Sequence, residues 1–217
     1  MPPPLLLTRP EADARRFARL LPGWPAVIAP ILRIEPVAHD GAALASAPGL
    51  VFTSAHAVPA AGPGRGRPAI CVGAGTGAAA RAAGFAVTEG EGTATSLLPL
   101  IAACPTPLIH PHGRHLARAL PVPGVVVYDQ VPQPLTAEAA ALLAGEGPVI
   151  LPVFSPRSAR LLAEAVGHVR APLWLVAISP AADAAFTAPA ARRVLADAPS
   201  AEAMAAAISR IAAAERS

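Results

Sequence analysis

The chain has 217 residues, a hydrophobic content of 53% and a mean hydropathy of +0.49. Proline, glycine and arginine interrupt every apolar run before the roughly 18 residues that a membrane-spanning helix needs, so we expect no membrane partner. The net charge is +3, all 17 basic residues are arginines, and 4% of the residues are aromatic. Because scattered arginines and few stacking rings do not fit nucleic acid, the composition favours an acidic small molecule as the partner.

The cysteines and the first residues indicate the compartment. Cys71 lies in an apolar run and Cys104 precedes a proline, without the paired spacing of a disulfide or zinc motif. Both are expected to be free thiols in a reducing compartment. The opening MPPPLLLTRPEAD has no basic segment ahead of its short apolar run, so we expect no signal peptide and a cytoplasmic location.

Strand-like and helix-like segments alternate along the chain, which predicts an α/β fold of parallel sheets flanked by helices. The expected strands are residues 5–8, 26–29, 50–53, 69–72, 86–88, 107–110, 125–128, 149–154 and 174–178. The expected helices are residues 11–21, 76–83, 137–144, 157–165 and 201–214. Ser200 is the expected N-cap of the last helix.

Two longer extended segments, residues 31–37 (ILRIEPV) and 125–134 (VVVYDQVPQP), do not fit this alternation. A pair of such segments is typical of a two-stranded β linker between two domains. The expected parts are a discontinuous domain of residues 1–34 plus 133–217, an inserted domain of residues 38–128, and linker strands at residues 34–37 and 129–132.

We expect the linker strands to act as a hinge, so that the two domains close when a ligand binds. The reason is that two extended, proline-bounded segments connect halves that are otherwise self-contained. Saturation with ligand should therefore reduce the radius of gyration measured by small-angle scattering. An unchanged radius at saturation would count against the hinge.

Six apolar runs are each followed by a small polar, glycine or proline elbow and then by an expected helix. At such an elbow, free backbone N–H groups and the positive end of the helix dipole favour a bound anion. The sequence therefore predicts that backbone N–H groups and arginines hold a polyanionic small molecule. The six segments are residues 5–21, 50–58, 70–85, 108–120, 149–162 and 173–186.

A glycine-rich elbow leaves a second function open. Residues 72–78 (VGAGTGA) match the Gly-x-Gly-x-x-Ala dinucleotide pattern, and Glu89 lies where a ribose-binding carboxylate would be expected. A nucleotide-dependent α/β enzyme built on residues 73–78 is therefore an alternative. We favour a tight elbow in which Gly73 and Thr76 hold a carboxylate or phosphate.

Residues 110–115 (HPHGRH) place three histidines within six positions, and the His-x-His spacing invites a metal ion. Arg114 puts a fixed positive charge among them and no carboxylate accompanies them, so we expect no metal. We interpret the segment as a loop in which His112, Gly113 and Arg114 face an anion.

Hydroxyl groups complete the candidate site. Ser54, Ser155, Ser158 and Ser179 lie outside any nucleophile motif, so we interpret them as helix caps that also contact the ligand. Tyr128 is the only tyrosine. Its phenol is interpreted as a hydrogen-bond or proton donor in the cleft between the domains. The alternative is a tyrosine at a strand end with its hydroxyl in water.

Short motifs that run the length of the chain carry a family resemblance. They are TRP at residues 8–10, FTSA at 52–55, VG at 72–73 with Thr76, VY at 127–128 with VP at 131–132, FSP at 154–156, ISP at 178–180 and PSAEAMAAAI at 199–208. In order and spacing they resemble the uroporphyrinogen-III synthase family.

The resemblance implies a two-domain α/β protein that cyclises hydroxymethylbilane, a linear tetrapyrrole with acetate and propionate groups. The product is uroporphyrinogen III, formed with inversion of ring D and loss of water. The pyrroles supply the electrons, so the resemblance implies neither a cofactor nor a metal, and the protein acts by positioning. Because one cleft is enough for the reaction, we expect a monomer. A hinged anion-binding module without activity is a further alternative.

The expected roles follow from the elbows and the resemblance together. Tyr128 is expected to protonate the leaving hydroxyl. Arg9 and Arg157 are expected to be the charged contributors, whereas Arg15 and Arg160 should face solvent. The expected substrate-binding residues are Thr8, Arg9, Thr53, Ser54, Ala55, Gly73, Thr76, His112, Gly113, Arg114, Ser155, Pro156, Arg157, Ser158 and Ser179.

Overall fold

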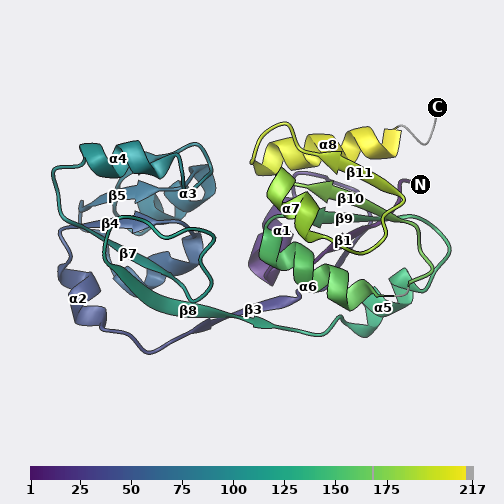
Figure 1. The fold of residues 1–217 in the computed structure, drawn as a ribbon, viewed down its shortest axis with the longest axis horizontal. Helices are drawn as coiled ribbons and strands as arrows, with labels where there is room; N and C mark the ends of the chain where they lie inside the picture. The colour runs from purple at the N-terminus through teal and green to yellow at the C-terminus, as the bar shows by residue number, and fades with distance from the viewer. Residues whose placement is uncertain (168, 214–217) are drawn as a thin grey trace. The chain divides into compact units, whose positions relative to one another are not determined.

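The computed structural model describes residues 1–167 and 169–213 of the chain (Figure 1). The contacts between residues divide it into two compact units. Unit 1 comprises Met1–Arg33 and Pro132–Ser217, and unit 2 comprises Ile34–Val131.

Unit 1 is built on a five-stranded sheet in which every adjacent pair of strands is parallel. The strand order is β11 (Arg192–Leu195), β10 (Leu173–Ala177), β9 (Val149–Val153), β1 (Leu5–Leu7) and β2 (Ala26–Ile28). The helices are α1 (Glu11–Ala18), α5 (Ala137–Leu143), α6 (Pro156–Val166), α7 (Pro180–Ala185) and α8 (Ala201–Ala213).

The central strands of unit 1 are apolar on both faces because helices cover both sides of the sheet (Figure 1). Successive side chains of a strand point to opposite faces. Leu6 of β1 accordingly packs in a core with α5, α6 and α7, whereas Leu5 and Leu7 pack in a second core with α1 and α8. A continuous run such as LLL is therefore what a parallel sheet covered on both faces requires.

The second sheet has six strands. Their order is β3 (Leu32–Pro36), β8 (Gly124–Pro132), β7 (Leu108–Gly113), β4 (Gly49–Phe52), β5 (Pro68–Cys71) and β6 (Ala86–Glu89). The helices of unit 2 are α2 (Gly41–Ser46), the 3₁₀ helix η1 (Ala55–Ala61), α3 (Ala74–Ala82) and α4 (Leu97–Ala103). Strands β3 and β8, which carry the chain from one unit to the other, are neighbours in this sheet.

One arginine of unit 2 is committed to the fold. The guanidinium of Arg67 donates hydrogen bonds to five backbone carbonyls and lies 5.1 Å from the centre of the Phe85 ring. The carbonyls belong to Leu44, Ala47, Ala61, Pro63 and Gly64. Only arginine offers enough donors for such a set. The Arg67 guanidinium therefore links loops of unit 2 through hydrogen bonds and is not directed at a ligand.

The predicted α/β fold with parallel sheets is confirmed, and the differences are local. Three elements were not predicted from the sequence: β11, α2 and α4. The helix expected within residues 108–120 was wrong, because β7 runs through Gly113 and residues 114–120 form no helix. The chain stays beside β8 instead: the Arg114 N–H donates to the Tyr128 carbonyl at 2.9 Å. The elbow after β4 leads into a 3₁₀ helix rather than an α-helix.

Candidate active site

In unit 1, three elbows lie at one edge of the sheet, because β1, β9 and β10 are parallel and end there. Arg9 follows β1, Phe154 follows β9 and Ser179 follows β10. The Arg9 Cζ atom lies 4.3 Å from the centre of the Phe154 ring, a cation–π contact that joins the first two elbows. Thr8, beside Arg9, is buried. Parallel strands thus gather residues far apart in sequence at one edge.

The serines at these elbows cap the helices that follow. Ser155 Oγ accepts a hydrogen bond from the Ser158 N–H at 3.1 Å, and Ser179 Oγ accepts one from the Ala182 N–H at 3.3 Å. Both helices then place proline at their first position. The capping predicted for these two serines is confirmed. Ser158 is not a cap, since it lies inside α6 and shares a 2.9 Å hydrogen bond with Ser155 Oγ.

The arginines of unit 1 differ in exposure as expected. Arg9 is one-quarter exposed and lies 3.5 Å from Asp13, whereas Arg15 is about two-thirds exposed and pairs with Glu11 at 2.6 Å. Burial lowers the pKa of Arg9 from its usual value, and the Asp13 carboxylate acts in the opposite direction. On α6, Arg157 is half-buried. Arg160, one turn later, is exposed.

In unit 2, a β-bulge sets the direction of the Tyr128 side chain. His112 of β7 lies opposite Val126 of β8, but Gly113 lies opposite Tyr128, so Val127 is an extra residue in β8. A bulge of this kind redirects the side chains that follow it. The Tyr128 ring consequently lies against Gly113, where a Cβ atom would be 2.5 Å from the ring's Cε2. Tyr128 is not at a strand end with its hydroxyl in water, since β8 continues to Pro132 and the residue is 6% exposed.

The Tyr128 hydroxyl has two hydrogen-bond partners that act on its pKa. It is hydrogen-bonded to the Ser54 side chain and to the backbone of Gly113. Burial raises the pKa of Tyr128, and the two hydrogen bonds act in the opposite direction. The His56 ring meets the Tyr128 ring edge to face, with 5.9 Å between their centres. Ser54 also caps η1, because its Oγ accepts from the His56 N–H at 3.3 Å, as predicted. Tyr128 is therefore a fixed, protonated phenol at neutral pH.

The histidine-rich segment is a buried strand, so its interpretation as a loop was wrong. His110 and His112 alternate with Pro111 in β7 and are 2% and 8% exposed. Their ring centres are 4.8 Å apart. His110 Nε2 shares a 2.9 Å hydrogen bond with Thr53 Oγ1, and His112 Nδ1 lies 2.8 Å from the Gly113 carbonyl.

His110 should make the fold sensitive to acid. Burial lowers its pKa from 6.5 to about 4, with the nearby His112 adding to the effect. The unfolded chain therefore takes up a proton below pH 6.5 that the folded chain refuses until about pH 4. Stability is thus complete above pH 6.5 and falls by about 2–3 kcal/mol towards pH 4. Urea unfolding at pH 7 and pH 4.5 measures this loss. The His110→Gln variant, which has no such proton site, should lose less; equal losses would contradict the assignment.

The Arg114 guanidinium has a counterion on β8, although 56% of its side chain is exposed. Arg114 Nε donates to Asp129 Oδ2 at 2.9 Å, and His115 Nε2 lies 3.4 Å from Asp129 Oδ1. The role of Arg114 in holding an anion stays a prediction. Asp129 is next to Tyr128 in sequence, so the same strand that presents the phenol also neutralises this arginine.

The glycine-rich elbow between β5 and α3 is tightly packed. Gly73 precedes α3, and a Cβ atom on it would lie 3.3 Å from the Gly92 Cα. Thr76 is 8% exposed. Glu89 pairs with Arg81 at 2.5 Å and its carboxylate occupies the space beside Gly77. The carboxylate that a dinucleotide ribose would need is therefore engaged, which argues against the nucleotide alternative.

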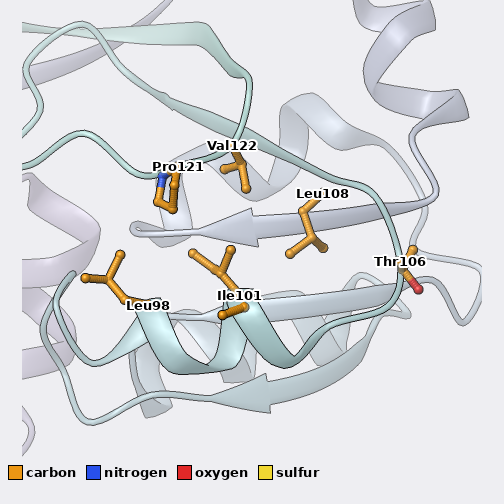
Figure 2. Close-up of a pocket in the computed structure, with 7 residues that line it drawn as sticks. Leu98, Ile101, Thr106, Leu108, Pro121 and Val122 are labelled. Atoms are coloured by element: carbon orange, nitrogen blue, oxygen red, sulfur yellow. The ribbon is translucent and has the colours of Figure 1, made fainter.

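An apolar groove lies elsewhere on unit 2, with a volume of about 370 Å³ (Figure 2). It is lined by Leu98, Ile101, Ala102, Thr106, Leu108, Pro121 and Val122. No lining side chain carries a charge. Leu108 begins β7, whereas Gly113, which lies against the Tyr128 ring, ends that strand. This groove does not suit a polycarboxylate.

Among residues 1–167 and 169–213, no three His, Cys, Asp or Glu side chains are grouped so that they could hold a metal ion. In the same residues, no helix is both long and apolar enough to cross a membrane.

Residues 18–206 match the protein-family model described as "Uroporphyrinogen-III synthase HemD". The chain belongs to the uroporphyrinogen-III synthase family. The resemblance seen in the sequence is thereby confirmed, and the function is that of a uroporphyrinogen-III synthase, a lyase of haem biosynthesis. Comparison with curated proteins gives no match.

Solved uroporphyrinogen-III synthases share the fold. The enzyme from Helicobacter pylori 26695 is similar with a TM-score of 0.66 and 14% identity, over 97% of this chain and 100% of that one. A mutant uroporphyrinogen III synthase from the extremely thermophilic bacterium Thermus thermophilus is similar with a TM-score of 0.53 and 17% identity, over 99% of this chain and 100% of that one. At such low identity the likeness supports the architecture rather than individual residues.

For a uroporphyrinogen-III synthase, the structure groups the expected residues into two sets. In unit 1, Thr8, Arg9, Ser155, Pro156, Arg157, Ser158 and Ser179 follow the ends of β1, β9 and β10. In unit 2, Thr53, Ser54, Ala55, His112, Gly113 and Tyr128 gather around β4, β7 and β8, and Gly73 and Thr76 follow β5.

Three further residues of unit 2 belong to this set and were not predicted from the sequence. His110 bonds to Thr53, His56 packs against Tyr128, and Asp129 neutralises Arg114. The period of two in His-Pro-His was a usable signal for the first, because it places both imidazoles on one face of a strand.

Proposed function

We propose that this chain converts hydroxymethylbilane into uroporphyrinogen III with Tyr128 as the proton donor to the leaving hydroxyl. The observation that carries the proposal is the hydroxyl of the only tyrosine, held by Ser54 and the Gly113 backbone beside the ends of β4 and β7. A donor that is already oriented lowers the activation free energy, because it does not have to be positioned during the reaction. Burial keeps the phenol protonated until it is used, because it raises the pKa.

The reaction needs a proton for the leaving hydroxyl and then stabilisation of the negative charge that remains on the Tyr128 oxygen. The Tyr128 proton joins the leaving hydroxyl as water departs, and the electron pair of the adjacent pyrrole nitrogen forms the azafulvene. The substituted carbon of ring D attacks this centre to give a spiro intermediate, which fragments and recloses. Meanwhile the Ser54 and Gly113 hydrogen bonds stabilise the phenolate. The phenolate recovers a proton when the last pyrrole ring regains its aromaticity.

The substrate's carboxylates are proposed to bind near arginines and helix N-termini, where the electrostatic potential is positive. In unit 1, Arg9 and Arg157 accompany the first turns of α1 and α6, where the positive ends of the helix dipoles lie. In unit 2, the elbow of Gly73 and Thr76 offers the first turn of α3 in the same way. We further propose that the chain acts as a cytoplasmic monomer, because a single copy of each group is enough.

The free energy of substrate binding should be distributed over these contacts. Arg9→Ala and Arg157→Ala are each expected to weaken substrate binding by about 1–3 kcal/mol, the scale of one charged hydrogen bond. The KM for hydroxymethylbilane measures the effect. Arg15→Ala on α1 and Arg160→Ala on α6 are matched controls and should leave KM unchanged. Complete loss of binding from one of the first two changes would show that the contacts are concentrated at that arginine.

Isomer analysis tests the proposal as a whole. Hydroxymethylbilane is incubated with the protein, the products are oxidised, and the type I and type III isomers are separated. We expect the type III isomer to form faster than spontaneous closure yields type I. Type I alone, at the uncatalysed rate, would reject the function. Tight binding of NAD or ATP would instead favour the nucleotide alternative.

A further inference from the structure

One buried histidine has no role in the chemistry above. His110 lies in the middle of β7 with 2% of its surface exposed, and its Nε2 is 2.9 Å from Thr53 Oγ1. Its backbone N–H donates to the Pro123 carbonyl at 2.8 Å, which anchors it to the start of β8. The imidazole therefore joins β7 to the residue that follows β4.

Thr53 is the immediate neighbour of the residue that holds the phenol. Ser54 has an extended backbone, with φ −156° and ψ 141°, and successive side chains of an extended chain point in opposite directions. Thr53 can thus be fixed by His110 while Ser54 reaches Tyr128. A shift of Thr53 moves Ser54 Oγ as well, since a single peptide unit separates them.

We propose that His110 is a positioning residue for the cyclisation: through Thr53 it fixes the Ser54 hydroxyl, and through Ser54 it fixes the Tyr128 hydroxyl. The inference rests on the proposed role of Tyr128. It also reassigns Thr53, whose hydroxyl is directed at His110 and not at the substrate.

The chemistry of the imidazole suits this task. The groups that face it are His112 on its own strand and the Thr53 hydroxyl, and burial with the nearby His112 keeps it neutral. A neutral imidazole bonds to a hydroxyl in either tautomer, since one nitrogen donates and the other accepts. It thus orients Thr53 without placing a charge near the developing phenolate. A histidine that only filled the core would affect stability but not turnover.

The test is a double-mutant cycle with the full chain, scored by type III isomer formation. The proteins are wild type, His110→Leu, Tyr128→Phe and the double variant. We expect His110→Leu to lower kcat on the order of tenfold with KM within about twofold. In the Tyr128→Phe background it should lower kcat no further, because the group it positions is gone.

A rescue and a control separate positioning from packing. His110→Gln keeps a side chain that can hydrogen-bond to the Thr53 hydroxyl, so it should restore kcat to within about threefold of wild type. Thr53→Val removes the hydroxyl in nearly the same shape and should reproduce the His110→Leu loss, and it takes that variant's place in the cycle if His110→Leu does not fold. The matched control His39→Leu changes an exposed histidine outside the site and should leave kcat unchanged.

The outcomes distinguish this inference from the function on which it rests. Wild-type kcat in Tyr128→Phe would remove the proposed proton donor, and the positioning role with it. Impaired Tyr128→Phe with fully additive losses in the double variant would overturn the role of His110 alone. Unchanged kcat in both His110→Leu and Thr53→Val would also overturn it.

Discussion

Tyr128→Phe is expected to lower turnover by roughly 10- to 10³-fold, towards the low end of that range, while the chain folds as the wild type does. General acid catalysis contributes about 10²- to 10⁴-fold in enzymes, and here the pyrrole electrons supply part of the driving force. The fold should survive because Phe keeps the ring that packs against Gly113 and His56. Rates of type III isomer formation at saturating substrate, together with urea unfolding, measure the two effects.

The pH dependence gives an independent check on the same group. A general acid must be protonated, so activity is lost only above its pKa. Burial raises the pKa of Tyr128, which moves that loss to higher pH than an ordinary tyrosine near 10 would show. Wild-type turnover should therefore be constant on the alkaline side to at least about pH 9. Full activity in Tyr128→Phe would show that the ring only packs against the substrate.

The framework of the fold could be predicted because its signals are local. LLL in β1 and VILPV in β9 are runs without a polar residue, as strands buried on both faces must be. The caps of α6 and α8 were also visible, because a serine followed by a helix-forming segment is enough to start a helix. Ser200 Oγ indeed accepts from the Ala203 N–H at 3.1 Å.

The missed strand β11 shows where local signals end. Its sequence, RRVL, begins with two arginines and none of its residues is buried, so it does not read as a strand. The partners that make it one are distant in sequence. The Arg192 guanidinium lies 4.3 Å from the centre of the Trp174 ring, and Arg193 donates to the Phe186 carbonyl at 2.8 Å. Each arginine is thus accommodated by contacts that only the folded chain creates.

The candidate site divides in the same way. Tyr128, Ser54 and Gly113 could be identified from residue type and family resemblance, but the bulge that brings them together depends on the register between β7 and β8. The Arg114–Asp129 pair likewise depends on that pairing, since 15 residues separate its members. Composition could not show that the Arg67 guanidinium binds backbone carbonyls within the fold. The sequence identifies the candidate groups, whereas strand pairing determines which of them can contact a ligand.

Gly113→Ala should impair both folding and turnover. The new Cβ would lie 2.5 Å from Tyr128 Cε2, 2.6 Å from Cζ and 2.9 Å from the hydroxyl oxygen, closer than real Cβ contacts allow. A ring is rigid, so it must move away or the strand must shift. We expect a loss of about 1–3 kcal/mol in the free energy of unfolding. Turnover should fall at least as far as in Tyr128→Phe, because the displaced hydroxyl leaves Ser54 and the Gly113 backbone.

A compensating change tests whether the ring is the cause. Gly113→Ala combined with Tyr128→Ala removes the overlap, so the double variant should be more stable than the sum of the two single losses predicts, by about 1 kcal/mol or more, as for coupled neighbours. Its turnover should stay low, since the phenol is absent. Gly41→Ala is the matched control in unit 2, because no atom lies within 4 Å of its new Cβ. Strictly additive losses at positions 113 and 128 would mean that Gly113 serves the backbone alone and does not seat the tyrosine.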